Sequence, residues 1–245
     1  MITRTLTAAP FAALLAALPL ASSVHAEEAS PFTANVGIVS DYAYRGWSQT
    51  DEKPALQGGF DYAHSSGLYA GVWGSNVSWL NDIKASKSPG NSLELDLYAG
   101  YKGTAGPIGY DVGLLQYYYP GNYSASWRAD SGLKKPHTLE GYIGVSWEFL
   151  TFKYSYAFTD LFGAPNSDGS QYFDLGASHE VMPGLKLSAH IGRQKIENGV
   201  SYNDWKLGAT QSLGGFDIGL FYVDTDVNNA KLARERVILS ISRAF

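Results

Sequence analysis

From residue 30 to the C-terminus, apolar and polar residues alternate with a period of two. Residues 93–102 show this most clearly, with Leu93, Leu95 and Leu97 on one face of an extended segment. Glu94 and Asp96 fall on the other face. Successive side chains of a β-strand point to opposite faces, so this period predicts strands that separate an apolar from a polar environment. No stretch has the period expected of a helix, and the predicted class is therefore all-β.

The alternating runs are about ten residues long and are separated by clusters of Gly, Pro, Asn, Asp and Ser, which favour turns. They predict twelve strands, near residues 32–46, 54–64, 68–78, 92–102, 108–119, 138–149, 151–161, 171–181, 185–195, 203–213, 216–224 and 235–245. Short connections alternate with longer ones along the chain. An even strand number with this alternation is typical of bacterial outer-membrane barrels. We therefore expect a transmembrane antiparallel β-barrel of about twelve strands, with short periplasmic turns and longer extracellular loops.

A soluble β-sandwich or lipocalin-like barrel also has alternating strands and is the alternative fold. Three features favour a membrane barrel. Aromatic residues, 14% of the chain, concentrate near strand ends, as in the girdles at membrane interfaces. The polar faces carry full charges, which a soluble core rarely buries. The last strand ends in Phe245 and resembles the C-terminal signal that the outer-membrane assembly machinery recognises.

The first 26 residues predict a cleaved export signal. Arg4 supplies a positive charge, residues 8–20 are almost wholly apolar, and residues 24–26 resemble a cleavage site. The apolar run is too short for a spanning helix, which needs about 20 residues. Residues 27–245 then form one barrel domain, expected in the outer membrane of a Gram-negative bacterium. The chain contains no cysteine, which excludes disulfides and thiolate metal sites.

Removal of the signal leaves 17 basic and 23 acidic residues, because Arg4 is its only charged residue. A net negative charge argues against a nucleic-acid partner. The expected partners are outer-membrane lipid and lipopolysaccharide, the barrel assembly machinery through Phe245, and small polar solutes or cations.

Residues 40–49, with the letters SDYAYRGWSQ, are followed by PALQG at 54–58 and by GLYAGVWGSNV at 67–77. Together with ELDLYAGY at 94–101, these segments resemble porins of the TorF family. The resemblance implies a Gram-negative outer-membrane barrel with a transport role. It implies no catalytic residue and no particular substrate.

Motifs that could carry chemistry are weak. Asp224, Asp226, Asn228 and Glu235 have the spacing of a calcium loop, but Asn229 replaces the glycine that this loop needs and no helices flank it, so calcium binding stays open. His190 lies near Ser188 on the polar face of a strand, yet nothing in the spacing requires a nucleophile and a base to meet. We therefore predict no catalytic, cofactor-binding or metal-binding residue.

Twelve strands should enclose a narrow lumen, between the filled interior of eight strands and the open channel of sixteen. The predicted function is passive passage of small polar solutes or ions; a lipid-modifying or hydrolytic barrel enzyme and a closed structural or adhesive barrel are the alternatives. With Glu180, Asp217 and Arg236 included, eleven acids and six bases point inward, which predicts a mild cation preference. The predicted pore-lining residues are Asp41, Arg45, Asp61, Glu94, Asp96, Lys102, Asp111, Glu140, Glu148, Lys153, Asp174, Lys186, Asp204 and Lys206.

Overall fold

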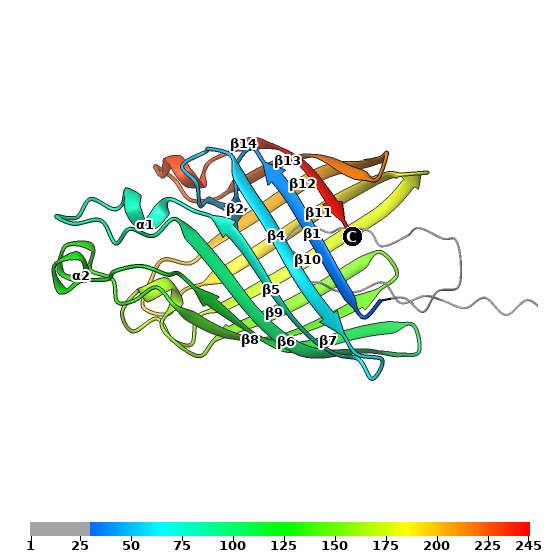
Figure 1. Cartoon of the computed structure of the whole chain (residues 1–245), viewed down its shortest axis with the longest axis horizontal. Helices are drawn as coiled ribbons and strands as arrows, with labels where there is room; N and C mark the ends of the chain where they lie inside the picture. The colour runs from blue at the N-terminus through cyan, green and yellow to red at the C-terminus, as the bar shows by residue number, and fades with distance from the viewer. Residues whose placement is uncertain (1–29) are drawn as a thin grey trace, which may run out of the picture.

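A computed structural model describes residues 30–245, which form a closed antiparallel barrel of twelve strands (Figure 1). Each strand pairs with its neighbours in the sequence, and the first pairs with the last to close the wall. The strands are β1 (Phe32–Val39), β4 (Ala55–Ala63), β5 (Leu68–Asn76), β6 (Leu93–Ala105), β7 (Ile108–Tyr118), β8 (Thr138–Trp147), β9 (Leu150–Ala157), β10 (Gln171–Met182), β11 (Leu185–Lys195), β12 (Tyr202–Leu213), β13 (Phe216–Thr225) and β14 (Arg236–Ala244). The predicted fold class is confirmed. The predicted signal peptide lies outside the described residues.

The two ends of the barrel differ. Tight turns and the C-terminus lie at one end, called the turn end, and the long connections lie at the other, called the loop end (Figure 1). Positive-φ residues make the turns, for example Gly106, Gly184 and the pair Gly214 and Gly215. The six connections of the loop end are L1 (residues 40–54), L2 (77–92), L3 (119–137), L4 (158–170), L5 (196–201) and L6 (226–235).

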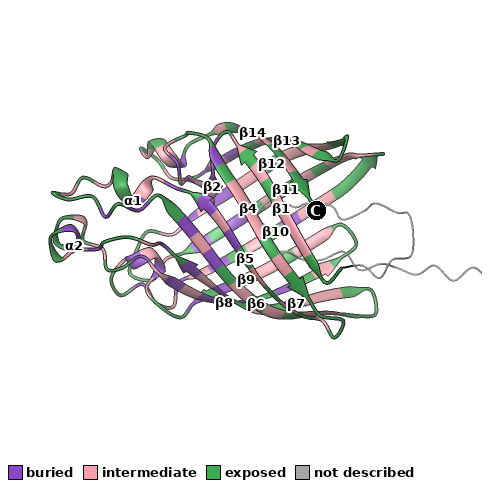
Figure 2. Cartoon of the chain, viewed as in Figure 1, coloured by how far each residue is buried: buried purple, intermediate pink, exposed green. Residues whose placement is uncertain are grey.

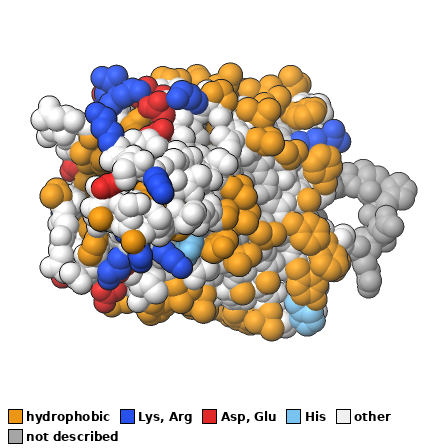
Figure 3. Space-filling model, turned by 60° about the vertical axis from the view of Figure 1, so that its left-hand side comes forward, with side chains coloured by type: hydrophobic (Ala, Val, Ile, Leu, Met, Phe, Trp, Pro, Cys, Tyr) orange, Lys and Arg blue, Asp and Glu red, His pale blue; other side chains and the backbone are white. Residues whose placement is uncertain are grey.

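The alternation seen in the sequence separates the outside of the wall from the lumen. On β6 the side chains of Leu93 and Leu97 are exposed on the outer surface, whereas Glu94 and Asp96 are buried inside the barrel. In Figure 3, hydrophobic side chains spread over the wall, and charged side chains gather mainly toward the loop end. An apolar outer band around a polar interior is the arrangement of outer-membrane barrels.

Within residues 30–245, no helix has the length and apolar character needed to cross a membrane.

Two parts of the fold differ from the sequence expectation. The first strand ends at Val39 and not near residue 46, because the chain leaves the wall there. Short helices also occur where none was expected: α1 (Trp79–Asp82) in L2, α2 (Ala125–Ser131) in L3, and the 3-10 turns η1 (Leu161–Gly163) and η2 (Lys231–Ala233). Each is at most seven residues long, too short to give a helical period in the sequence.

Candidate functional site

L1 turns into the barrel instead of extending away from it. It contains a small hairpin of β2 (Ala43–Tyr44) and β3 (Trp47–Ser48), joined at a tip formed by Arg45 and Gly46. Both tip residues have positive φ, 45° and 84°, as a two-residue hairpin turn requires. A Cβ at Gly46 would lie 2.3 Å from Thr225 Cγ2 and 2.9 Å from Asp204 Cβ, so only glycine fits the tip against the wall.

The Arg45 side chain crosses the lumen from this tip. Its Nη2 donates to both carboxylate oxygens of Glu140 on β8, at 2.7 and 3.0 Å, and its Nη1 donates to Gln194 Oε1 on β11 at 2.7 Å. The guanidinium also lies 4.2 Å from the centre of the Tyr172 ring. Arg45 therefore connects a loop that starts at β1 to strands on the far side of the barrel, and its charge is paired where water is excluded.

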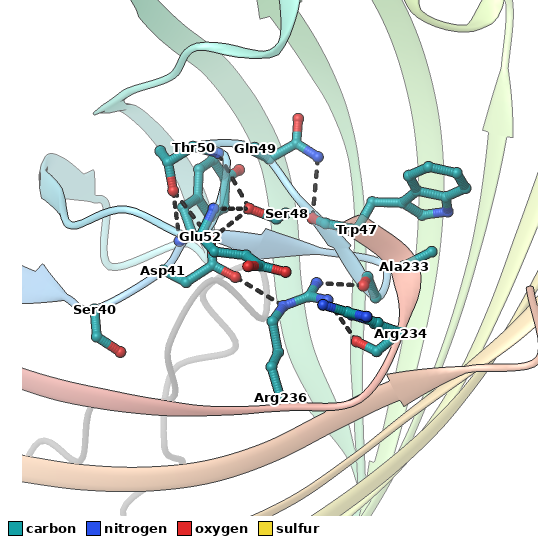
Figure 4. A network of polar contacts seen from close by, with 12 residues as sticks. Ser40, Asp41, Trp47, Ser48, Gln49, Thr50, Glu52, Ala233, Arg234 and Arg236 are labelled. Atoms are coloured by element: carbon teal, nitrogen blue, oxygen red, sulfur yellow. Dashed lines mark hydrogen bonds and ion pairs between the residues drawn. The ribbon is translucent and has the colours of Figure 1, made fainter. Parts of the chain in front are cut away.

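The base of the hairpin is held by Asp41, as Figure 4 shows. One carboxylate oxygen of Asp41 accepts hydrogen bonds from Ser48 Oγ at 2.5 Å and Thr50 Oγ1 at 3.0 Å. The other lies 2.7 Å from Arg236 Nε on β14. The sequence pattern predicted Asp41 and Arg45 on one face of one strand; the structure places both on L1, where they contact different partners.

Outside the lumen, L1 also contacts L6. Asp51 lies 3.0 Å from Lys53 Nζ and 3.0 Å from Lys231 Nζ. Hydrogen bonds from Lys53 and Lys231 lower the pKa of Asp51 below its ordinary value. Because Asp51 is half-buried and both lysines are exposed, the contact adds orientation more than stability.

Tyrosines link the hairpin to the neighbouring wall. The Tyr42 hydroxyl donates to Glu94 Oε1 at 2.9 Å, and the Tyr119 hydroxyl donates to Glu94 Oε2 at 3.0 Å. The hydroxyls of Tyr44 and Tyr117 are 2.7 Å apart. The hairpin and the residue before it are therefore bonded to the wall.

A second polar cluster surrounds His190 on β11. Its Nδ1 lies 2.7 Å from an oxygen of Asp174 and its Nε2 lies 2.7 Å from an oxygen of Asp204. Two carboxylates at this distance from both ring nitrogens suit an imidazolium, which donates from each nitrogen. Gly192 is the register partner of both aspartates and leaves the space for this bridge. This cluster was not predicted from the sequence. Its visible signal was an inward-facing glycine, Gly192, with an inward-facing aspartate on each neighbouring strand, Asp174 and Asp204.

His190 is not arranged as the base of a hydrolase. Its nitrogens face carboxylates, and no described hydrogen bond joins it to a serine hydroxyl. Nor do the described residues include a group of three or more His, Asp, Glu or Cys that could hold a metal ion. In the L6 region considered for calcium, Asp226 accepts hydrogen bonds from the backbone and side chain of Asn203.

The fourteen predicted pore-lining residues fall into three groups by burial. Buried ones are Asp41, Glu94, Asp96, Asp111, Glu140 and Asp204; half-buried ones are Arg45, Asp61, Lys102, Lys153, Asp174, Lys186 and Lys206. Glu148 is the exception, because it is exposed in the turn between β8 and β9 and has a φ of 52°. It lies at the rim of the turn end rather than on the wall.

Burial inside the barrel is graded along its length. Figure 2 shows that buried residues concentrate in the half of the barrel nearer the loop end, whereas residues of the other half are intermediate or exposed. The hairpin accounts for this difference, because its side chains pack against the wall on the loop side. Residues of the half nearer the turn end are therefore less buried than those beside the hairpin.

The barrel is similar to solved porins in fold. It matches the KdgM porin with a TM-score of 0.56 at 5% identity, covering 87% of this chain and 99% of that one. The COG4313 outer-membrane channel from Pseudomonas putida F1 gives 0.51 at 13% identity, with 93% and 100% covered. A NanC porin structure gives 0.50 at 11% identity, with 87% and 98% covered.

At the level of sequence, no curated protein matches the chain. One family model, described as a bacterial protein of unknown function (Gcw_chp), matches residues 25–244. This model does not carry the TorF name that the first strands suggested. Because the match spans nearly the whole chain, the protein belongs to the Gcw_chp family.

Proposed function

We propose that this protein is a narrow outer-membrane channel for small polar solutes or ions, with the L1 hairpin as its constriction. The observation that carries the proposal is the path of Arg45, which leaves a loop, enters a closed barrel and pairs with Glu140 on the far wall. A barrel with no transport role could fill its lumen with wall side chains, as small barrels do. Here a separate, hydrogen-bonded hairpin enters the half of the barrel nearer the loop end.

Conductance in planar bilayers tests the proposal. We expect the native protein to form small channels, and we expect Arg45→Ala to raise the single-channel conductance, because the bulkiest side chain of the tip is removed. Arg128→Ala is the matched control, since Arg128 is an exposed arginine of α2 outside the lumen. Absence of channels in the native protein and in a variant lacking residues 43–48 would favour a closed structural barrel instead.

A mild cation preference remains part of the proposal. The excess of acidic over basic groups inside the barrel, on which this preference rests, is smaller than the sequence predicted. Glu148 and Glu180 are exposed at the turn end, and His190 adds a positive charge. Within residues 30–245, the lumen and hairpin then hold nine acids, Asp41, Asp61, Glu94, Asp96, Asp111, Glu140, Asp174, Asp204 and Asp217. They face seven bases, Arg45, Lys102, Lys153, Lys186, His190, Lys206 and Arg236.

Reversal potentials in asymmetric KCl measure this preference. We expect a modest preference for potassium at about 0.1 M salt and less at 1 M, because the Debye length falls from about 10 Å to about 3 Å. Asp96→Asn combined with Glu94→Gln should reduce it, since these variants remove two charges near the hairpin. An anion preference of the native channel at low salt would contradict the expectation.

A further inference from the structure

Charged side chains are rare on the outer surface of the wall. On β11, Arg193 and Lys195 share the outward face with Leu187 and Ile191, and all four side chains are exposed. In the half of the barrel nearer the loop end, the outward positions of the other strands carry one further charged residue, Asp224 on β13. Its carboxylate already accepts hydrogen bonds from its own strand, at 2.8 and 3.2 Å. Among the described strands, Arg193 and Lys195 are therefore the outward cations of this half.

The position of these two bases along β11 matches one surface of a membrane. From Leu185 to Arg193 the strand advances by about 27 Å, at about 3.4 Å per residue. A tilt of about 40° reduces this to about 21 Å, close to the apolar band of about 25 Å on outer-membrane barrels. The register partner of Arg193 on β10 is Phe173, whose ring lies 5.1 Å from that of Tyr154, as in an aromatic girdle. Arg193 and Lys195 thus stand at the level where hydrocarbon gives way to lipid headgroups.

Neither base has a carboxylate partner among the described residues. The Arg193 Nη1 donates to the side-chain oxygen of Asn203, its register partner on β12, at 3.2 Å. This amide is neutral and leaves the charge of the guanidinium uncompensated. The register partner of Lys195 is Gln171 on β10, a second neutral amide. Glu197 of L5 is the nearest acid along the chain, and it is exposed. The cluster therefore combines two uncompensated positive charges with two amides.

The two bases are spaced to act on one group. They lie two residues apart on one face of β11, so their Cα atoms are about 7 Å apart and both side chains can reach a group between them. The planar guanidinium presents parallel N–H groups that fit two oxygens of a phosphate, and the ammonium adds a point charge. L5 follows Lys195 directly and, at residues 196–201, is the shortest connection of the loop end. No long loop therefore continues from β11 over the two bases.

We propose that Arg193 and Lys195 bind the phosphate of a lipid headgroup at the membrane surface of the loop end. The loops of an outer-membrane barrel face the outside of the cell. The phosphorylated lipid of that leaflet is the lipid A part of lipopolysaccharide, which is the occupant we assign. Its phosphate complements the two cations, and its acyl chains complement the apolar and aromatic wall below them. The site rests on the outer-membrane position of the proposed channel, but not on its conductance.

Lipid binding to the purified barrel in a neutral detergent tests the site, with bound lipid counted by native mass spectrometry. The probes are lipid A, the same lipid with its phosphates removed, and inorganic phosphate. We expect lipid A to bind with saturation. We expect each of the other two probes to bind at least about tenfold more weakly, because one lacks the phosphate and the other lacks the acyl chains.

Arg193→Gln combined with Lys195→Gln should weaken lipid A binding by at least about tenfold, because both charges are removed and polar side chains are kept. Lys87→Gln combined with Arg128→Gln is the matched control. It also removes one lysine and one arginine, both exposed, but from L2 and L3, and it should leave lipid A binding unchanged. Heat-modifiable mobility on gels shows that each variant is folded. Should the β11 variant fail to fold, the comparison of lipid A with its dephosphorylated form on the native protein decides.

Equal binding of lipid A and its dephosphorylated form to the native protein would overturn the proposal, as would full lipid A binding by the β11 variant. An equal loss in the L2 and L3 control would also overturn it, because binding would then follow the overall charge. Inorganic phosphate that binds as tightly as lipid A would make this a site for free phosphate and refute the lipid. Lipid A binding without conductance would refute the proposed channel but not the site, and conductance without lipid A binding would refute only the site.

Discussion

At the residue scale, the pair of Arg45 and Glu140 shows why a buried charge inside a barrel depends on its partner. The exposed fractions of the two side chains are 7% and 3%, so each has exchanged water for the other. Removing one member of such a pair is far more costly than removing both, because the remaining charge stays buried. The hairpin position therefore depends on a contact between residues separated by 95 positions in the sequence.

We predict that Arg45→Ala lowers the free energy of unfolding by about 3 kcal/mol and that Arg45→Ala with Glu140→Ala restores a part of it. Denaturant unfolding in detergent micelles measures both. Lys53→Ala is the control, because Lys53 pairs with Asp51 on the surface and should change stability by less than about 1 kcal/mol. Equal losses for the single and double variants would show that the pair does not couple the hairpin to the wall.

At the element scale, β14 both closes the barrel and ends the chain. Phe245 exchanges two backbone hydrogen bonds with Ala34, at 2.8 and 3.1 Å, and its exposed ring lies 5.1 Å from the Arg243 guanidinium. The strand that completes the wall is thus also the one that displays the terminal aromatic residue. Arg243 faces outward at the turn end, where a long side chain can reach the membrane surface.

We predict that deleting Phe245 reduces the amount of folded barrel in the outer membrane while export continues, because the deletion removes the closing backbone pair with Ala34 and the terminal residue that resembles an assembly signal. Heat-modifiable protein in membrane fractions is the measurement, and secreted unfolded protein is the check on export. Leu213→Ala is the control, since Leu213 is similarly exposed, 66% against 67% for Phe245, but does not end the chain. Normal folding after the deletion would show that the C-terminal resemblance has no role in assembly.

At the scale of the whole molecule, the closed wall leaves no free strand edge, because β1 and β14 pair along five registered positions. The outer surface carries exposed Leu, Ile, Val and Phe side chains on every face of the cylinder that the strands describe. Such a surface is stable in lipid or detergent and not in water.

We therefore predict that the purified protein needs detergent and runs at different apparent sizes on gels before and after boiling. We expect the closed hydrogen-bond network of the barrel to resist detergent at room temperature and to open on heating. Recovery of folded protein from a periplasmic extract without detergent would contradict this prediction.

The sequence by itself determined the wall. Eleven of the twelve strands were predicted within four residues of their observed bounds, because alternation is a local property that each strand carries alone. The same parity assigned Glu94, Asp96 and Asp204 to the lumen side, where all three are buried. Local alternation also explains the one strand that was wrong: residues 40–46 keep an alternating pattern, but in an inward hairpin.

Only the tertiary structure decided where L1 goes and which charges meet. Arg45 finds Glu140 and Gln194 because closing the barrel brings β8 and β11 within reach of a loop that follows β1. His190 finds two aspartates because register sets Gly192 between them. Alternation assigns a side chain to the lumen without assigning it a partner, since partners across a lumen are fixed by barrel closure and strand register. That is why the sequence predicted a polar interior, whereas the fold determined where the L1 hairpin lies inside it. The fold also left one carboxylate without a partner, Asp96, among the described acids of the lumen wall.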